Sequence, residues 1–234
     1  RTLTAEIGRV AEQANGAALM RYGDTTVLVT ATASDKPRDG IDFFPMSIDY
    51  EERLYSVGKI PGGFIKREGR PSEKAVLTAR CIDRPLRPLF PKDYRNDVAI
   101  VATVMSVDQD CSPEVLAMIG ASLALNISDI PFTDPVSSVN IGYCDGQLVV
   151  NPTAEQRETT KLNLTVSSKE DKVMMIEAGA DEIPDALMME AIHLAFDTNL
   201  EVAKWIKEIV AKEGKEKAPY TEYVIPEDAY QLVT

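Results

Sequence analysis

The stretch that decides the fold runs from Gly58 to Pro91 and reads GKIPGGFIKREGRPSEKAVLTARCIDRPLRPLFP. It begins as a loop rich in Gly and Pro, continues as a short helix, and ends in a segment rich in Pro and Arg. Residues 59–95 carry ten Lys or Arg against four Asp or Glu, a local charge of +6 in a chain of net charge −12. A basic region on an acidic protein indicates a localised polyanion site. The alternative is that these cations pair with acidic neighbours in the fold.

The loop at the start of this stretch has the composition of a mobile tip that binds single-stranded RNA. Gly62 and Gly63 allow the backbone to approach a ligand closely. An apolar ring beside cations can stack on a base while the cations neutralise phosphates. We predict RNA contacts at Phe64, Lys66, Arg67 and Arg70.

The helix that follows supplies a second tier of predicted RNA contacts, at Arg80, Arg84 and Arg87. A capping Ser72 predicts that the helix begins there, and we expect it to end before Pro85. The first two Arg are four residues apart and share one helix face. Pro85 and Pro88 are expected to hold the third Arg in an extended segment, where a guanidinium suits bidentate phosphate contacts.

The rest of the chain predicts an α/β unit with mixed sheets and helices packed on one side of each. Strands are expected at 4–11, 17–21, 25–33, 43–55, 98–107, 136–143, 147–150, 162–167 and 172–177. Asn15-Gly16 predicts a hairpin turn. The strand at 98–107 is rich in β-branched residues and should be buried on both faces. Ser112-Pro113 predicts the start of a central apolar helix, and a long helix is expected over 185–212.

The composition gives no sign of a membrane-spanning segment, a secretory signal or a cysteine or histidine site. No run of about 18 apolar residues is present to span a membrane, and no signal peptide is visible. The three Cys are widely spaced, which favours reduced thiols in a cytosolic protein over a metal site. His193, the single His, falls on the polar side of the long helix and is interpreted as a surface residue.

The motifs at 58–73 and 82–91 resemble those of the polynucleotide phosphorylase family, and more narrowly the first of its two RNase PH-like domains. Further matching segments are 23–25, 43–45, 50–53, 117–122 and 151–153, and the resemblance covers residues 1 to about 210. It implies the RNase PH-like fold with mixed sheets and left-handed βαβ crossovers. It also implies one domain over 1–211, in two parts of about 1–128 and 129–211, followed at 212–234 by a linker and the start of an all-helical segment.

The same resemblance implies a reaction and its participants. Family members degrade RNA from its 3′ end: inorganic phosphate attacks the terminal linkage and releases a nucleoside diphosphate, and the reverse reaction polymerises diphosphates. Mg²⁺ is the implied cofactor and inorganic phosphate the co-substrate. The implied assembly is a homotrimer that forms a pseudo-hexameric ring around single-stranded RNA. A cytoplasmic role in mRNA degradation follows, with proteins of an RNA-degradation complex as further partners and no membrane association.

Three departures from the family pattern limit what this chain is expected to do. The phosphate-binding Gly-Ser-Ser turn of the active copy is replaced by Asp110-Cys111-Ser112-Pro113, which adds a carboxylate and loses an N–H donor. The strand that matches the metal site reads Lys161-Leu-Asn-Leu-Thr165, without an acidic residue. The tip has Ile65 and Lys66 where the family has Phe and Arg. We therefore predict no catalytic and no metal-binding residue here, and place the phosphorolytic site and its Mg²⁺ in a second copy.

Three functional hypotheses remain open at this point. The first is the RNA-binding half of a phosphorolytic exoribonuclease; the absence of Met at position 1 is consistent with a fragment. The second is a non-catalytic ring subunit like those of exosomes, which is expected to stop near Lys212. The third is an enzyme with its own nucleotide or phosphate site at Arg80, Arg84 and Ser112.

Overall fold

The structure, a computed structural model, describes residues 1–64, 66–222 and 231, and it contains two sheets. Sheet A has the strand order β1-β2-β3-β5-β4, and sheet B has the order β7-β6-β8-β9. The strands are β1 (Leu3–Ile7), β2 (Gly16–Tyr22), β3 (Thr25–Ala33), β4 (Met46–Glu52), β5 (Val98–Ser106), β6 (Ser137–Cys144), β7 (Gln147–Val150), β8 (Leu162–Ser168) and β9 (Val173–Ala180). Within the described residues, β4 and β5 form a parallel pair and the other pairs are antiparallel.

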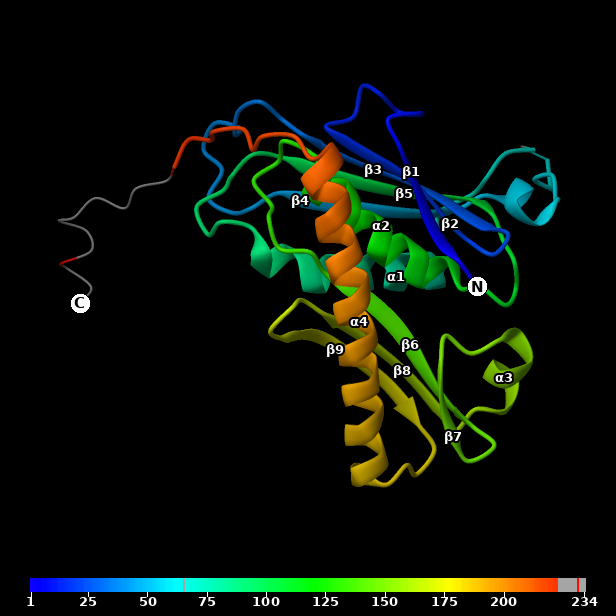
Figure 1. Cartoon of the computed structure of the whole chain (residues 1–234). Helices are drawn as coiled ribbons and strands as arrows, with labels where there is room; N and C mark the ends of the chain where they lie inside the picture. Colours follow the sequence, from blue (N-terminus) through cyan, green and yellow to red (C-terminus); the bar gives the residue numbers. More distant parts are fainter. Residues whose placement is uncertain (65, 223–230, 232–234) are drawn as a thin grey trace.

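The helices join and cover these sheets (Figure 1). They are α1 (Glu73–Leu86), α2 (Pro113–Ile127), α3 (Ala154–Thr159) and α4 (Asp185–Glu213), with short 3₁₀ turns η1 (Leu54–Val57) and η2 (Arg87–Leu89). The crossover from β4 through α1 to β5 is the parallel βαβ unit of sheet A. The predicted left hand of this crossover stays a prediction.

Helix α2 is the centre of the core because it packs on β2 and β3 of sheet A and also contacts β6 of sheet B. All but one of its residues are buried, as its apolar sequence predicts. Helix α4 bridges the two regions: Ala191 and Ala195 pack against sheet B, and Trp205 and Ile206 pack against the core around α2. The two sheets are therefore linked by a continuous layer of helix packing.

Three local predictions were wrong. Asn15-Gly16 is not a two-residue turn, because Gly16 already pairs with Ala31 in the sheet; the tight turn is Gly23-Asp24, between β2 and β3. A Cβ at position 16 would lie 2.1 Å from the carbonyl oxygen of Ala124. Glycine is therefore required at position 16 because α2 packs so closely against β2.

The second and third errors concern α1 and β5. Helix α1 continues through Pro85 to Leu86, and Arg87 has helical dihedral angles, so it does not lie in an extended segment. Proline costs one hydrogen bond of the helix there, because it has no N–H to donate to the carbonyl oxygen of Cys81. Strand β5 alternates between buried and partly exposed positions along Val98–Val104, so it is not buried on both faces.

The segment after α4, which we call the strap (residues 214–222), folds back onto the first part of the chain (Figure 1, orange to red). The Lys217 ammonium donates to the carbonyl oxygens of Leu125, Asn126 and Ser128, at the C-terminal end of α2, over 2.6–3.1 Å. Tyr220 donates its hydroxyl to Asp93 at 3.0 Å. This charged segment is thus docked on the core. Among the described residues, no helix has the length and apolar character needed to cross a bilayer.

Candidate nucleic-acid interface

The loop singled out from the sequence forms a projection that we call the tip (residues 54–71), at the end of sheet A where β4 finishes (Figure 1). It opens with η1, which ends at Gly58 with a φ of 70°, in the left-handed region that favours glycine. The base of the tip is tied together because the Glu68 carboxylate accepts a hydrogen bond from the Leu54 N–H at 2.9 Å. β4 and α1 therefore hold its two ends while its middle faces solvent.

The predicted contact residues of the tip are exposed, and Arg70 also lines a cavity beside the tip. Phe64 is fully exposed, and Lys66, Arg67 and Arg70 are exposed as well. With the residues that the structure describes, none of these three cations forms an ion pair or a side-chain hydrogen bond. Ile65 lies outside the described residues. The tip thus presents one ring and three uncompensated positive charges to a ligand.

The second tier of predicted contacts is split by the structure. Arg80 lies exposed on α1, and no acidic partner for it is found in the described part of the chain. Arg84 forms an ion pair with Glu177 of β9, and both side chains are about half exposed. An exposed pair of this kind contributes only about 0–1 kcal/mol, so it does little to hold the guanidinium in place.

The Arg87 side chain has a structural role. Its guanidinium pairs with Asp83 at 2.7 Å and donates to the carbonyl oxygens of Phe44 at 3.1 Å and Met46 at 2.9 Å. It also lies 5.7 Å from the centroid of the Phe44 ring. Because its donors are engaged in joining α1 to the segment that enters β4, we leave Arg87 out of the proposed RNA surface.

A cavity of about 1030 Å³ lies beside the tip, bounded by the N-terminal ends of α1 and α2 and by residues of sheet B. At the start of α2, Ser112 donates its hydroxyl to the Glu114 carboxylate, which also pairs with Lys74. Burial by itself raises the pKa of Glu114, but the hydrogen bonds from Lys74 and Ser112 outweigh burial and lower it. The carboxylate therefore stays charged at neutral pH, paired with Lys74 at the start of α2.

The residues of the third hypothesis are not assembled into a site. Ser112 lines this cavity, whereas Arg80 and Arg84 do not. The missing N–H of Pro113, now the first residue of α2, removes a further anion donor at the same helix end. The described geometry thus offers no phosphate-binding set built from those three residues.

The residues present do not fit a catalytic Mg²⁺ either. β8, which covers the strand expected to match the metal site, contains no acidic residue. Glu170 pairs with Lys207, and Asp171 pairs with Lys169 at 3.2 Å. Within the described residues, no three Asp, Glu, His or Cys side chains are grouped to hold a metal ion.

Sequence reasoning missed two features of this region. Lys59 is a fourth exposed cation of the tip, and its place in the basic stretch could have indicated it. The Lys74–Glu114 pair joins α1 to α2 and also approaches Glu52 at 3.7 Å. No spacing signal could have indicated that pair, because its members are forty residues apart.

The chain has close counterparts among known proteins. Polyribonucleotide nucleotidyltransferases of Caldicellulosiruptor saccharolyticus, Lachnoclostridium phytofermentans and Clostridioides difficile are 62%, 60% and 59% identical to it over 233 residues. These matches cover 100% of the chain, which spans 33% of the length of each relative. The resemblance to the polynucleotide phosphorylase family is thereby confirmed.

The fold is shared more widely. The crystal structure of rice Rrp46 superposes with a TM-score of 0.74 at 13% identity, covering 91% of this chain and 95% of that one. At that identity the likeness concerns the fold alone, and it supports the predicted RNase PH-like architecture. Residues 1–131 match the 3′ exoribonuclease family, domain 1, and residues 134–198 match its domain 2. The chain therefore belongs to the 3′ exoribonuclease family.

Proposed function

We propose that this chain is the RNA-binding N-terminal half of a phosphate-dependent 3′–5′ exoribonuclease that degrades mRNA in the cytoplasm. One observation carries the proposal: Phe64, Lys66, Arg67 and Arg70 stand exposed on a projecting tip, with no acidic partner among the described residues. A ring among cations is the surface chemistry that binds single-stranded RNA without reading its sequence. The 59–62% identity to polyribonucleotide nucleotidyltransferases supports the reaction.

The proposal includes a division of labour. The tip, with Arg80 and Arg84 behind it, binds and orients the RNA, while the bond-breaking groups come from a second RNase PH-like copy. Inorganic phosphate and Mg²⁺ would bind in that copy, where they would supply the attacking group and the compensating charge. The charged Glu114 and the acid-free strand β8 are the reasons for placing the chemistry there.

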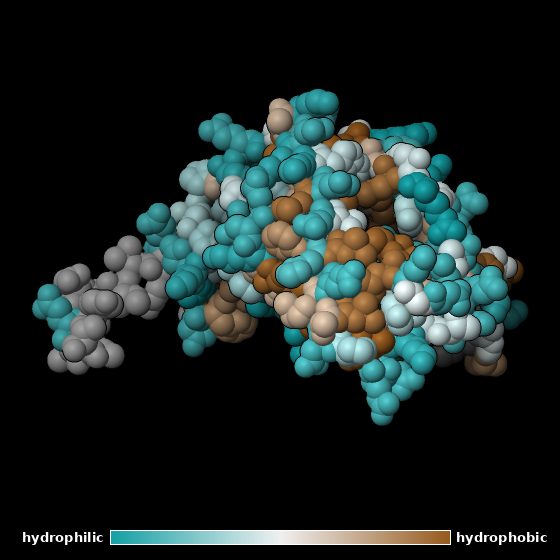
Figure 2. All heavy atoms as spheres, turned by 60° about the horizontal axis from the view of Figure 1, so that its bottom comes forward, coloured by the Kyte–Doolittle hydropathy of each residue, from teal (hydrophilic) through white to brown (hydrophobic). Residues whose placement is uncertain are grey.

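We further propose that residues 1–211 form one RNase PH-like domain of two parts, about 1–128 and 129–211, and that it assembles into a trimeric, pseudo-hexameric ring. An apolar patch on α1 and the neighbouring β9 is available for such contacts. It consists of Val76, Leu77, Val173 and Ile176, with exposures of 38–55%. Figure 2 shows apolar side chains gathered in the middle of one face, surrounded by hydrophilic ones. Proteins of an RNA-degradation complex would bind outside the ring.

The alternative of a non-catalytic, exosome-like ring subunit is less well supported. Eight relatives at 55–62% identity are polyribonucleotide nucleotidyltransferases, whereas the likeness to rice Rrp46 stands at 13%. An independent site at Arg80, Arg84 and Ser112 lacks support because these residues do not surround one cavity.

The test is to incubate the chain with oligo(A), inorganic phosphate and Mg²⁺, and to measure RNA retention and ADP release separately. We expect RNA to be retained at low salt and no ADP to form, even at high protein concentration. Failure to retain RNA would contradict the binding role. ADP release by the chain alone would contradict the division of labour.

A further inference from the structure

The tip concentrates exposed apolar side chains. Twelve large hydrophobic side chains are exposed among the described residues, and four of them fall within residues 55–64. They are Tyr55, Val57, Ile60 and Phe64, with exposures of 54%, 54%, 87% and 103%. Single exposed apolar residues are ordinary, but a cluster of this kind marks a surface that a partner covers.

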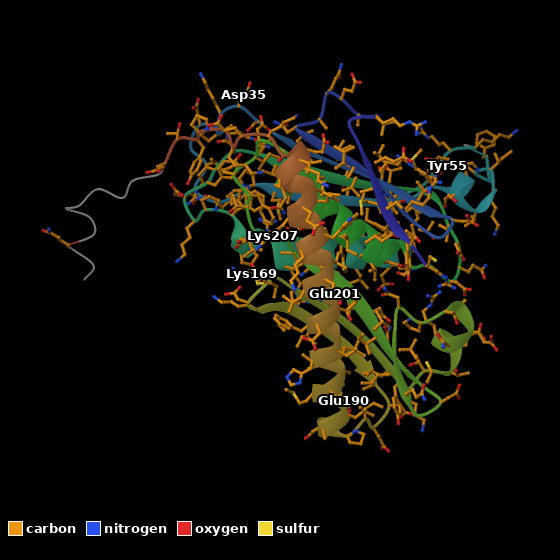
Figure 3. All side chains as sticks on the ribbon, viewed as in Figure 1. Asp35, Tyr55, Lys169, Glu190, Glu201 and Lys207 are labelled. Carbon is orange, nitrogen blue, oxygen red and sulfur yellow. The ribbon has the colours of Figure 1, made fainter. Side chains whose placement is uncertain are left out.

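Tyr55 is the second aromatic ring of this cluster, and it stands on a firmer support than Phe64. Its residue belongs to η1, where its carbonyl accepts from the Gly58 N–H at 3.0 Å. The adjacent Ser56 carbonyl accepts from the Val107 N–H at 3.2 Å, which pins the turn to the body of the domain. In the described part of the chain, the Tyr55 side chain has no hydrogen bond and no ring contact. Figure 3 shows it at the projecting end, far from α4.

The charge around this ring distinguishes a nucleic acid from a protein as the partner. Residues 54–71 contain four cations, Lys59, Lys66, Arg67 and Arg70, against a single acidic residue. That residue, Glu68, is turned toward the Leu54 N–H at the base of the tip. Protein interfaces are depleted of charge at their centre, whereas single-stranded RNA sites place aromatic rings among cations.

We propose that Tyr55 is a second base-stacking platform, so that the tip holds single-stranded RNA between the ring of Tyr55, which is carried on a hydrogen-bonded turn, and a more exposed ring at Phe64. The inference deepens the proposed RNA-binding function and rests on it. The ligand is the base portion of the RNA, recognised by its π-face, and its phosphates are left to the cations.

The experiment uses the full chain and an oligo(A) that contains 2-aminopurine, whose fluorescence is quenched on stacking. Tyr55→Leu should weaken RNA binding by about 5- to 150-fold, as expected for the loss of one stacked base, and should reduce quenching. Tyr55→Phe should retain both, since it keeps the ring. Because the ring carries no charge, the salt dependence of binding should be the same for Tyr55→Leu as for the unaltered chain.

The matched control is Phe43→Leu. Phe43 is a ring with 62% exposure in the loop that also carries Asp35, which Figure 3 shows on the opposite side of the molecule. This variant should bind RNA unchanged. Equal weakening by Phe43→Leu, or by Tyr55→Phe, would overturn the stacking role.

The outcomes separate this inference from the proposed function. If alanine at Lys66, Arg67 and Arg70 weakens binding while Tyr55→Leu does not, the tip binds RNA and the stacking role of Tyr55 is wrong. If Tyr55→Leu leaves RNA binding unchanged but alters self-association in sedimentation, the apolar cluster joins copies of the chain and the inference is overturned. If neither set of changes affects RNA binding, the proposed function itself fails.

Discussion

Replacing Lys217 by Met should destabilise the whole domain, although this residue lies in the strap beyond the last helix. Its ammonium donates to the carbonyl oxygens of Leu125, Asn126 and Ser128 at 3.1, 2.9 and 2.6 Å. These groups end α2, which leaves its last carbonyls without partners inside the helix. A cation at a helix C-terminus also complements the helix dipole. The strap is therefore a cap on the central helix of the core.

The size of the effect follows from the partners that remain. Leu125 keeps a second donor, because the Ser128 hydroxyl also donates to its carbonyl at 2.7 Å. The carbonyls of Asn126 and Ser128 lose the bond from Lys217, at about 1–1.5 kcal/mol each. We expect the free energy of unfolding to fall by about 2–3 kcal/mol. Burial lowers the pKa of Lys217 to about 8, so the ammonium keeps its proton at pH 7.

The assay is urea denaturation at pH 7, followed by tryptophan fluorescence and circular dichroism. Lys212→Met is the control, because Lys212 lies exposed in the last turn of α4 and should change stability by less than about 0.5 kcal/mol. Equal stability of the Lys217→Met and Lys212→Met variants would refute the capping role. Intact cooperativity with a lower midpoint is the expected result.

Three further predictions concern the body of the domain. Arg87→Met should lower the free energy of unfolding by about 2–3 kcal/mol, because it removes two hydrogen bonds to carbonyl oxygens and the ion pair with Asp83. RNA affinity should change less than twofold. A large loss of affinity in a folded variant would show that Arg87 contacts RNA. Gly16→Ala should cost about 1–3 kcal/mol in thermal or urea unfolding because of the clash with Ala124, and an unchanged midpoint would contradict that packing. Because the pKa of Glu114 is lowered in the fold, its contribution to stability is present above the ordinary glutamate pKa and is lost as the pH falls through the lowered value. Glu114→Gln should flatten the acid side of the stability profile, measured by denaturation at several pH values, and an identical profile would rule the contribution out.

Predictions from local sequence succeeded where periodicity and apolar character decide the structure. α2 and α4 appear close to their expected bounds because a helix that is apolar all round must be buried and a long amphipathic one must cover a sheet. The Gly16 error arose because glycine was interpreted as turn chemistry, whereas the close approach of α2 requires it. That approach is a tertiary contact, which no window around Asn15 contains.

In the candidate site, too, features set by local sequence could be predicted and features set by tertiary contacts could not. The exposure of Phe64 and the tip cations follows from a local loop of Gly, Pro and charge, and the sequence indicated it. The role of Arg87 could not be predicted, because its partner carbonyls at Phe44 and Met46 lie more than forty residues away. A run of cations in sequence thus contained both solvent-exposed and structural members, and packing separates them.

The most direct test of the central claim measures RNA affinity against salt for the chain and for a variant with alanine at Lys66, Arg67 and Arg70. Each lost phosphate contact should make the logarithmic salt slope shallower by about 0.7 for a single strand. Three contacts give a change of about 2, so the affinity difference between the two proteins should shrink about 20-fold from 50 to 200 mM salt. The control variant removes the same charge at three exposed lysines away from the tip, Lys36, Lys204 and Lys212, and should keep the original slope. Identical slopes for the tip variant and the unaltered chain would contradict the account.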